Sequence, residues 1–533
     1  MTEVDVLKKI VFMMLIASIL VAGLVLPGCA GGGGDGNGNG DGDGDGGPDT
    51  RPPITFAVAG AMNDVAGRHA LWGAELARDE INGGAGVNVG DVCYKIELIQ
   101  VDTNEVSGTP EEGVAALEAI IDNVDFVLGG WRTANIQVYR EVAMDAQKIF
   151  MNCGASTGAL QGSVVTDYDH YKYWFKVSPY NEFFLTNSLF KMVGQFTDQF
   201  RDALIAEGDA VDPAYKIGEA DKLRVAIIAE DAVWCTWLVT VFQGKITTLG
   251  YDLVGTWLVS PTATDISAEL LDIVGKQPHL IMSIFSRPMA VVYSKQRVEL
   301  GIPAMSIGIK HEGEQKEQWA NTEGKCNGEI MLDTWAEGLQ NTAKTTTFFD
   351  AFVAKTGEYP IYTASTYDAI YQLKEAVEAV SVVHGWSDIA DVVNPTNIDS
   401  LIQYIETQPY TGTAGKIAYY PMPGITVGGG TYALSETQVR ALYPSLVGYE
   451  QGQWLVKPTE AMTGSHLAHD TVYGPGYETG IGSQWQDGHK VGVWPVDLGD
   501  DYDEALTDQY GCWNFEYPGT VDVVIPIEGF LAS

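Results

Sequence analysis

Residues 126–158 carry the pattern that most limits how this chain can fold. Two short apolar segments, 126–128 and 149–152, are predicted as strands, and residues 134–146 between them as a helix. Strands joined by a crossover helix pair in parallel and end at the same edge of the sheet, where ligands bind in such folds. The pattern therefore predicts an α/β fold with a binding edge after these two strands.

Both strands are followed by glycines and small polar residues. These are Gly129, Gly130, Trp131, Arg132 and Thr133 after the first strand, and Gly154, Ala155, Ser156 and Thr157 after the second. Glycines let a ligand approach the backbone closely, hydroxyls supply neutral hydrogen bonds, and helix N-termini favour an anionic group. Two such loops side by side suit the carboxylate or amide of a small molecule. Ordinary strand-to-helix turns have the same spacing, so spacing alone leaves both interpretations open.

Strand and helix alternate over most of the chain. The predicted strands are 54–62, 94–101, 126–128 and 149–152, and, after a long helix at 181–200, 224–230, 253–259, 280–285 and 304–307. This alternation is typical of a doubly wound parallel sheet, and its restart predicts a second lobe of the same kind.

Composition excludes several classes of function. The chain has 533 residues, 46% of them hydrophobic, which is enough for two packed lobes. Its formal charge of −39 argues against a nucleic-acid partner, because few Lys/Arg runs exist to neutralise phosphates. The 6 cysteines include no Cys-x-x-Cys pair, which argues against a zinc cluster, and their pairing stays open. No Gly-x-x-x-x-Gly-Lys-[Ser/Thr] motif for ATP occurs.

The N-terminus is predicted to be a targeting segment. Lys8 and Lys9 precede an apolar run, 10–26, which ends in Leu-Pro-Gly-Cys at Cys29. This ending resembles a bacterial lipobox, which would make Cys29 a lipid-modified residue. The alternative is an uncleaved transmembrane anchor. Residues 30–53 are rich in glycine and aspartate and are predicted to be a flexible linker.

An enzymatic alternative comes from the same loop. Residues 154–158 read Gly-Ala-Ser-Thr-Gly, which matches the Gly-x-Ser-x-Gly pattern of a nucleophile elbow. A serine hydrolase also needs an acid and a downstream histidine, and His311, His466 and His469 are available. No HGGG-type oxyanion loop precedes the motif, and the residues after Gly158 are expected to start a helix poorly. A binding site is therefore favoured over a hydrolase.

The order of several segments resembles that of type I periplasmic binding proteins. The segments are ITFAVAGAMNDVAG…WGAELARDEING, YKIELIQVDTNE, DFVLGGWRTANI, KIFMNCGAS, YWFKVSP, YTASTYDAIYQLKEAVE and GPGYETGIGSQWQDGHKVGVWP. Within that class, the chain is similar to the branched-chain (hydrophobic) amino-acid binding lipoproteins of ABC importers. The resemblance implies two doubly wound, Rossmann-like α/β lobes joined by three hinge crossings, near Ser178, 331–335 and 411–416.

The resemblance also implies a division of the chain. The expected parts are a lipoprotein signal segment (1–29), a linker (30–53), lobe 1 (54–178 plus 335–412), lobe 2 (179–334 plus 413–497, with an insertion at 421–472) and a C-terminal extension (498–533).

A set of ligand-binding residues is implied as well. Thr133 and Ser156 are expected to give hydroxyls to the ligand carboxylate, and Glu312 to be the acid for its ammonium. Arg132 either pairs with the carboxylate or points to solvent. The whole set is Arg68, His69, Trp131, Arg132, Thr133, Cys153, Gly154, Ala155, Ser156, Phe285, Ser286, Arg287 and Glu312.

The implied function is solute capture outside the cytoplasm. The expected protein is a membrane-anchored, non-enzymatic lipoprotein that closes on a carboxylate-bearing solute and presents it to ABC permease subunits. No cofactor or metal is implied. A branched-chain or other hydrophobic amino acid is the favoured ligand. Short amides, urea-like compounds and aromatic acids are alternatives, as is a sensor ectodomain with the same fold.

Overall fold

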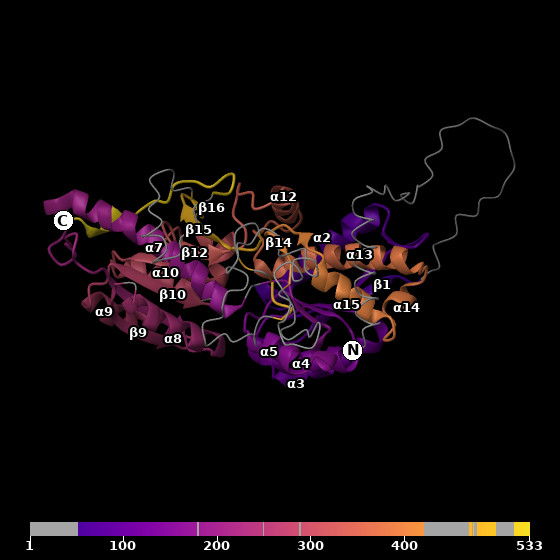
Figure 1. Cartoon of the computed structure of the whole chain (residues 1–533). Helices are drawn as coiled ribbons and strands as arrows, with labels where there is room; N and C mark the ends of the chain where they lie inside the picture. Colours follow the sequence, from indigo (N-terminus) through magenta and orange to yellow (C-terminus); the bar gives the residue numbers. More distant parts are fainter. Residues whose placement is uncertain are drawn as a thin grey trace, which may run out of the picture.

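The computed structural model describes residues 52–178, 181–248, 250–286, 289–419, 468–471, 473, 477–496 and 516–532. These residues form two α/β lobes that lie side by side, each built on its own sheet (Figure 1). The prediction of two doubly wound lobes is confirmed. The signal segment, residues 30–51 of the linker, most of the insertion and residues 498–515 of the C-terminal extension lie outside the described residues.

The first sheet contains only parallel pairs. Its strands are β1 (Ile54–Gly60), β4 (Ile96–Asp102), β5 (Phe126–Gly129), β6 (Phe150–Asn152) and β7 (Trp174–Lys176), in the order β4-β1-β5-β6-β7. The connecting helices are α2 (Val65–Gly83), α3 (Pro110–Glu118), α4 (Thr133–Asp145), α5 (Ala159–Thr166) and α6 (Tyr168–Tyr171). A short hairpin, β2 (Val87–Val89) and β3 (Val92–Tyr94), precedes β4.

The second sheet repeats this order and adds an antiparallel edge. Its strands are β8 (Arg224–Glu230), β9 (Asp252–Val259), β10 (Leu280–Phe285), β11 (Met305–Lys310), β12 (Ile330–Asp333), β15 (Ile481–Gln486) and β16 (His489–Trp494), in the order β16-β15-β12-β11-β10-β8-β9. Its helices are α7 (Glu182–Glu207), α8 (Val233–Thr248), α9 (Ser267–Gly275), α10 (Met289–Glu299) and α11 (Glu317–Asn321). In both lobes the first strand lies between the second and the third. Each sheet therefore has a switch point at its carboxyl edge, where ligands bind in such folds.

The chain returns to the first lobe after β12. The returning elements are α12 (Thr345–Thr356), the 3₁₀ turn η4 (Tyr362–Ser365), α13 (Thr366–His384), α14 (Ile389–Val392), α15 (Ile398–Thr407) and the hairpin β13 (Tyr410–Thr411) and β14 (Lys416–Ile417). Gly73 of α2 lets η4 pack closely, because a Cβ there would lie 2.3 Å from the Ala364 carbonyl oxygen. The chain passes between the lobes after β7 and after β12, and reaches the second sheet again at β15.

Several details differ from the expectations, among them the following. The segment after Gly158 does form a helix, α5, because the Gly158 N–H donates to the Glu182 carboxylate at 2.6 Å and the helix start gains a distant partner. Helix α7 continues to Glu207, beyond the expected end at residue 200. The expected strand 94–101 is split between β3 and β4.

Candidate functional site

The loops after β5 and β6 meet at the carboxyl edge of the first sheet. The two strands pair in parallel, with Gly129 opposite Asn152. A Cβ on Gly154 would lie 1.8 Å from the Gly130 carbonyl oxygen. Gly130 has a φ of 84°, which residues with a side chain rarely adopt. The glycines thus bring the two loop backbones into direct contact.

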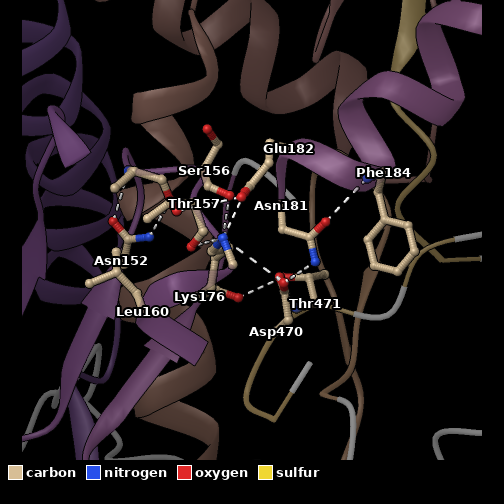
Figure 2. A network of polar contacts seen from close by, with 12 residues as sticks. Asn152, Ser156, Thr157, Leu160, Lys176, Asn181, Glu182, Phe184, Asp470 and Thr471 are labelled. Atoms are coloured by element: carbon tan, nitrogen blue, oxygen red, sulfur yellow. Dashed lines mark hydrogen bonds and ion pairs between the residues drawn. The ribbon is translucent and has the colours of Figure 1, made fainter. Parts of the chain in front are cut away.

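Hydrogen bonds hold the loop after β6 from two sides (Figure 2). The Asn152 side chain accepts from the N–H groups of Gly154 and Ala155 at 3.2 and 3.0 Å, and donates to the Ala155 carbonyl at 2.8 Å. The Lys176 ammonium donates to the Ser156 carbonyl at 2.9 Å and to the next carbonyl at 3.4 Å. The backbone that carries the Ser156 hydroxyl is therefore fixed before any ligand arrives.

Lys176 belongs to a fully buried charged network, shown in Figure 2. Its ammonium lies 4.0 Å from the Asp470 carboxylate, and neither side chain is exposed. Burial lowers the pKa of Lys176 and raises the pKa of Asp470 to about 6. Asp470 also accepts from the Asn181 amide at 2.7 Å, next to Glu182 at the start of α7. The network thus links the binding loop to the first crossing between the lobes.

A buried carboxylate fixes the loop after β5. Glu105 accepts hydrogen bonds from the Arg132 N–H, from the Thr103 hydroxyl at 2.7 Å and from the Tyr139 hydroxyl at 3.0 Å. Burial raises the pKa of Glu105. The half-buried Arg132 guanidinium donates to the Glu105 carbonyl at 3.2 Å. The Arg132 side chain is therefore engaged with the protein rather than pointing to solvent.

A cleft of about 390 Å³ lies between the lobes at this edge. From the first lobe it is lined by Trp131, Arg132, Thr133, Ala134, Asn135, Gly154, Ser156 and Tyr362, and from the second by Leu185, Asp231, Ala232, Trp234, Thr236, Pro261, Ser286 and His311. Its volume falls in the range of small-molecule sites, roughly 300–1,000 Å³.

The first-lobe wall of the cleft offers donors to an anion. The hydroxyls of Thr133 and Ser156 have no hydrogen-bond partner among the described residues, although the two residues are only 8% and 9% exposed. Thr133 is the first residue of α4, whose first-turn N–H groups and helix dipole favour negative charge. This wall suits a carboxylate held mainly by neutral donors.

The second-lobe wall carries two rings, those of Trp234 and His311, and Glu230 holds Trp234 and Ser286 in place. Glu230 accepts from the Ser286 N–H at 3.1 Å, from the Ser286 hydroxyl and from the Trp234 indole N–H. The ring centroid of His311 lies 5.6 Å from that of Trp234 and 4.6 Å from that of Tyr362. Burial lowers the pKa of His311 to about 4, so the imidazole is neutral at neutral pH. This row of rings suits an apolar ligand body.

Six of the residues expected to bind ligand line the cleft. They are Trp131, Arg132, Thr133, Gly154, Ser156 and Ser286. Cys153 and Ala155 lie in the same loop but are buried in the lobe core and do not line the cleft.

The other expected residues lie elsewhere. Phe285 is buried in the core of the second lobe. His69 is buried, its Nδ1 accepts from the Ile361 N–H at 3.2 Å, and burial lowers its pKa to about 3. Arg68 and Glu312 line a separate cavity of about 150 Å³. Arg287, like Cys29, lies outside the described residues.

Sequence reasoning missed most of the second-lobe wall. Asp231 directly follows β8, a strand whose position was expected, so the rule that ligands bind at carboxyl ends of strands pointed to it. Trp234 and Pro261 follow β8 and β9 in the same way. Tyr362 had no such signal, because it lies in a 3₁₀ turn brought to the cleft by the returning chain.

The described cysteines and the possible metal-binding groups were also compared with the cleft. Cys153, Cys235 and Cys326 are free and buried, and Cys93 is disulfide-bonded. Over the described ranges, no three His, Cys, Asp or Glu side chains are grouped to hold a metal ion. In that same part of the chain, no helix combines the length and the apolar character that a bilayer crossing requires.

Two α/β lobes with a ligand-sized cleft between their carboxyl edges define a two-lobed solute-binding protein. The family model described as periplasmic binding protein matches residues 55–424. The chain belongs to this family. Its members bind solutes outside the cytoplasm and are not enzymes, which sets aside the hydrolase interpretation of Ser156.

Solved structures share the fold at low identity. A solute-binding protein of an ABC transporter from R. palustris, in complex with benzoate, has a TM-score of 0.56 at 13% identity, covering 83% of this chain and 96% of that one. A putative branched-chain amino acid ABC transporter protein from Silicibacter pomeroyi has a TM-score of 0.56 at 17% identity, covering 85% and 98%. The branched-chain amino acid transporter substrate binding protein LivJ from Streptococcus pneumoniae, in complex with isoleucine, has a TM-score of 0.52 at 17% identity, covering 69% and 92%. No curated protein sequence matches.

Proposed function

We propose that this chain is the extracytoplasmic receptor of an ABC importer, and that it captures a small carboxylate-bearing solute between its lobes. The observation that carries the proposal is the two-sided cleft. The hydroxyls of Thr133 and Ser156, which have no hydrogen-bond partner among the described residues, lie on the first-lobe wall, and the rings of Trp234 and His311 lie on the opposite wall. A hydrophobic amino acid, with a branched-chain one first, fits both walls, and a relative of the same fold is in complex with isoleucine.

Capture follows from the stiffness of the first lobe. Its two binding loops are fixed by Asn152, Lys176 and Glu105. Binding of the carboxylate therefore costs little conformational entropy in these loops. Rotation of the second lobe about the crossings then covers the ligand body with Trp234 and its neighbours. Closure excludes water, which strengthens each hydrogen bond to the charged end.

The membrane attachment is a separate part of the proposal. A basic start, an apolar run and Leu-Pro-Gly-Cys at Cys29 support a lipid anchor. The linker 30–53 would let the receptor reach the permease subunits from that anchor.

The test of ligand class is a thermal-shift screen of hydrophobic amino acids, their amides and aromatic acids, followed by calorimetric titration. A ligand that binds only the folded state raises the melting temperature. Thr133→Val removes one uncommitted hydroxyl and should cost about 1–3 kcal/mol of carboxylate binding. Thr166→Val, on the exposed face of α5, is the matched control and should change nothing. Equal binding of acid and amide, or an unchanged affinity in Thr133→Val, would contradict the proposal.

A receptor for aromatic acids is the second candidate. The rings of Trp131, Trp234, His311 and Tyr362 all line the cleft, and the R. palustris protein of the same fold is in complex with benzoate. Stacking on such rings favours a flat ligand. A larger thermal shift with benzoate or 4-hydroxybenzoate than with leucine or isoleucine would select this candidate.

A further inference from the structure

The described C-terminal residues, 516–532, form a strap along the second lobe, here called the C-terminal strap. It runs beside β15 and β16 and ends near α7 (Figure 1). The Val521 N–H donates to the Gly492 carbonyl of β16 at 2.8 Å. The Gln484 side chain of β15 binds both the N–H and the carbonyl of Val524, each at 2.8 Å. These bonds fix the strap to the antiparallel edge of the second sheet.

The far end of the strap is anchored in the core of the second lobe. It closes with a 3₁₀ turn, η8 (Ile527–Phe530), and the Phe530 side chain has no exposure. The ring centroid of Phe530 lies 5.1 Å from that of Phe200 and 5.2 Å from that of Tyr215. Its carbonyl accepts from the Asp212 N–H at 2.8 Å. A buried ring and a backbone bond together prevent this end from sliding along the lobe.

The near end of the strap contacts two of the crossings between the lobes. The Tyr517 hydroxyl lies 2.8 Å from the hydroxyl of Thr479, just before β15, where the chain re-enters the second sheet. The Tyr517 side chain also packs against a small apolar cluster. Two members of that cluster, Ala336 and Leu339, belong to the crossing after β12, and the third is Ile481. One side chain thus joins both crossings.

Backbone contacts strengthen the grip on the crossing after β12. The Gln340 N–H donates to the Pro518 carbonyl at 2.8 Å. The next strap residue, Gly519, has a φ of 90°, and a Cβ there would lie 2.1 Å from the Gly338 carbonyl oxygen. The two backbones therefore lie in direct contact, which a side chain at residue 519 would prevent.

The location of these contacts matters because lobes of this kind rotate about their crossings. Such rotation is absorbed by backbone torsions of a few residues at the crossings. The Glu337 N–H donates to the Lys490 carbonyl of β16 at 2.9 Å, so this crossing is bound to the second lobe on a further side. Residues 336–340 are thereby held against the second lobe, and fewer residues are left to absorb a rotation.

We propose that the C-terminal strap braces the hinge: it fastens two of the three crossings to the second lobe and so narrows the range of orientations that the lobes sample. A narrower range before binding means that less conformational entropy is lost when the lobes close. The inference concerns the protein without ligand. Its test is therefore separate from that of the proposed function.

The experiment measures the distance between the lobes with two spin labels in the full-length protein. Cysteines for the labels replace Glu118 on α3 and Lys276 after α9, which are both exposed. The protein without these two cysteines gives the background labelling. Electron–electron double resonance then yields the distribution of distances between the labels, without ligand, for the unchanged strap and for three strap variants.

Two variants should loosen the brace and one should not. Gly519→Ala drives the strap away from Gly338, and Tyr517→Ala removes the ring that joins the crossings. Each should broaden the distance distribution about twofold, because the freed crossings sample more torsions. Val524→Ala is the matched control on the same strap. Its side chain is 53% exposed, so the distribution should stay unchanged.

Unchanged widths in both Gly519→Ala and Tyr517→Ala would overturn the inference, as would equal broadening in Val524→Ala. If the first two variants fail to fold, hydrogen exchange of the wild-type protein decides. The amides of Gln340 and Val521 donate to strap or strand carbonyls, so they should exchange as slowly as those of β15. Exchange as fast as in exposed loops would show that the strap is not seated, and the inference would fail.

Discussion

Removing the Lys176 ammonium should destabilise the first lobe strongly. Lys176→Met keeps the length of the side chain but deletes the donor to two loop carbonyls and the partner of Asp470. Because both charged groups have no exposure, the deletion leaves a buried carboxylate uncompensated. Removing one partner of a buried ion pair lowers the free energy of unfolding by about 3–5 kcal/mol, which is a large share of the stability of a typical domain.

The assay is denaturant unfolding of four proteins in a double-mutant cycle: wild type, Lys176→Met, Asp470→Asn and the double variant. Because Asp470→Asn removes the charge that Lys176 compensates, the double variant should be less destabilised than the sum of the two single variants, by about 1–3 kcal/mol. Lys172→Met is the matched control. Lys172 pairs with Asp399, whose side chain is 69% exposed. Removing this exposed ion pair should lower the free energy of unfolding by at most about 1 kcal/mol.

The pH dependence supplies a further check. The pKa of Asp470 is raised from 3.8 to about 6 in the folded protein. Protonation of Asp470 therefore stabilises the folded state fully below about pH 4, and this stabilisation is lost as the pH rises through 6. The penalty of Lys176→Met should therefore be smaller at pH 5 than at pH 7.5, because a protonated Asp470 needs no cation. A penalty below about 1 kcal/mol, strict additivity in the cycle or a pH-independent penalty would refute the reasoning.

Three other outcomes are expected. Gly154→Ala should lower ligand affinity at least tenfold in calorimetric titration, because its Cβ would lie 1.8 Å from the Gly130 carbonyl oxygen and part the two loops; unchanged affinity would show that the loops separate freely. Cys153 should stay unmodified by a thiol reagent at pH 8 in the folded protein, because burial raises its pKa to about 12; rapid labelling would contradict this. Cys29→Ala should abolish partitioning into detergent, and unchanged partitioning would favour a transmembrane anchor instead.

The sequence predicted those elements whose pattern is local. β8 and β10 were expected at their observed bounds, because buried parallel strands are short continuous apolar runs between polar turns. The donors of the first-lobe wall, Thr133 and Ser156, were found because their strands are joined by a single helix and end at one edge. The hairpin β2–β3 was missed, because strands of three residues leave no clear periodicity.

The rest of the site depends on long-range geometry. Tyr362 reaches the cleft only because the returning chain packs on the first lobe, which no local pattern reveals. The place of Glu312 has a smaller cause. β11 was expected to end at residue 307 but runs to Lys310, and Glu312 lies in the 3₁₀ turn that follows, where it lines the separate cavity of about 150 Å³. An error of three residues at a strand end is thus enough to move an expected site residue away from the cleft.

The contact between Gly130 and Gly154 also limits how this receptor can acquire new ligands. Backbone packing of Gly154 against Gly130 sets how closely the two loops that carry Thr133 and Ser156 approach each other. Under the proposed function, substitutions at that end would alter the binding of every carboxylate alike and would not discriminate among the apolar parts of the ligands. Changes of preference must then arise on the opposite wall. A library confined to positions 231, 234 and 261 should therefore yield variants with altered selectivity that keep the proposed carboxylate-binding wall unchanged.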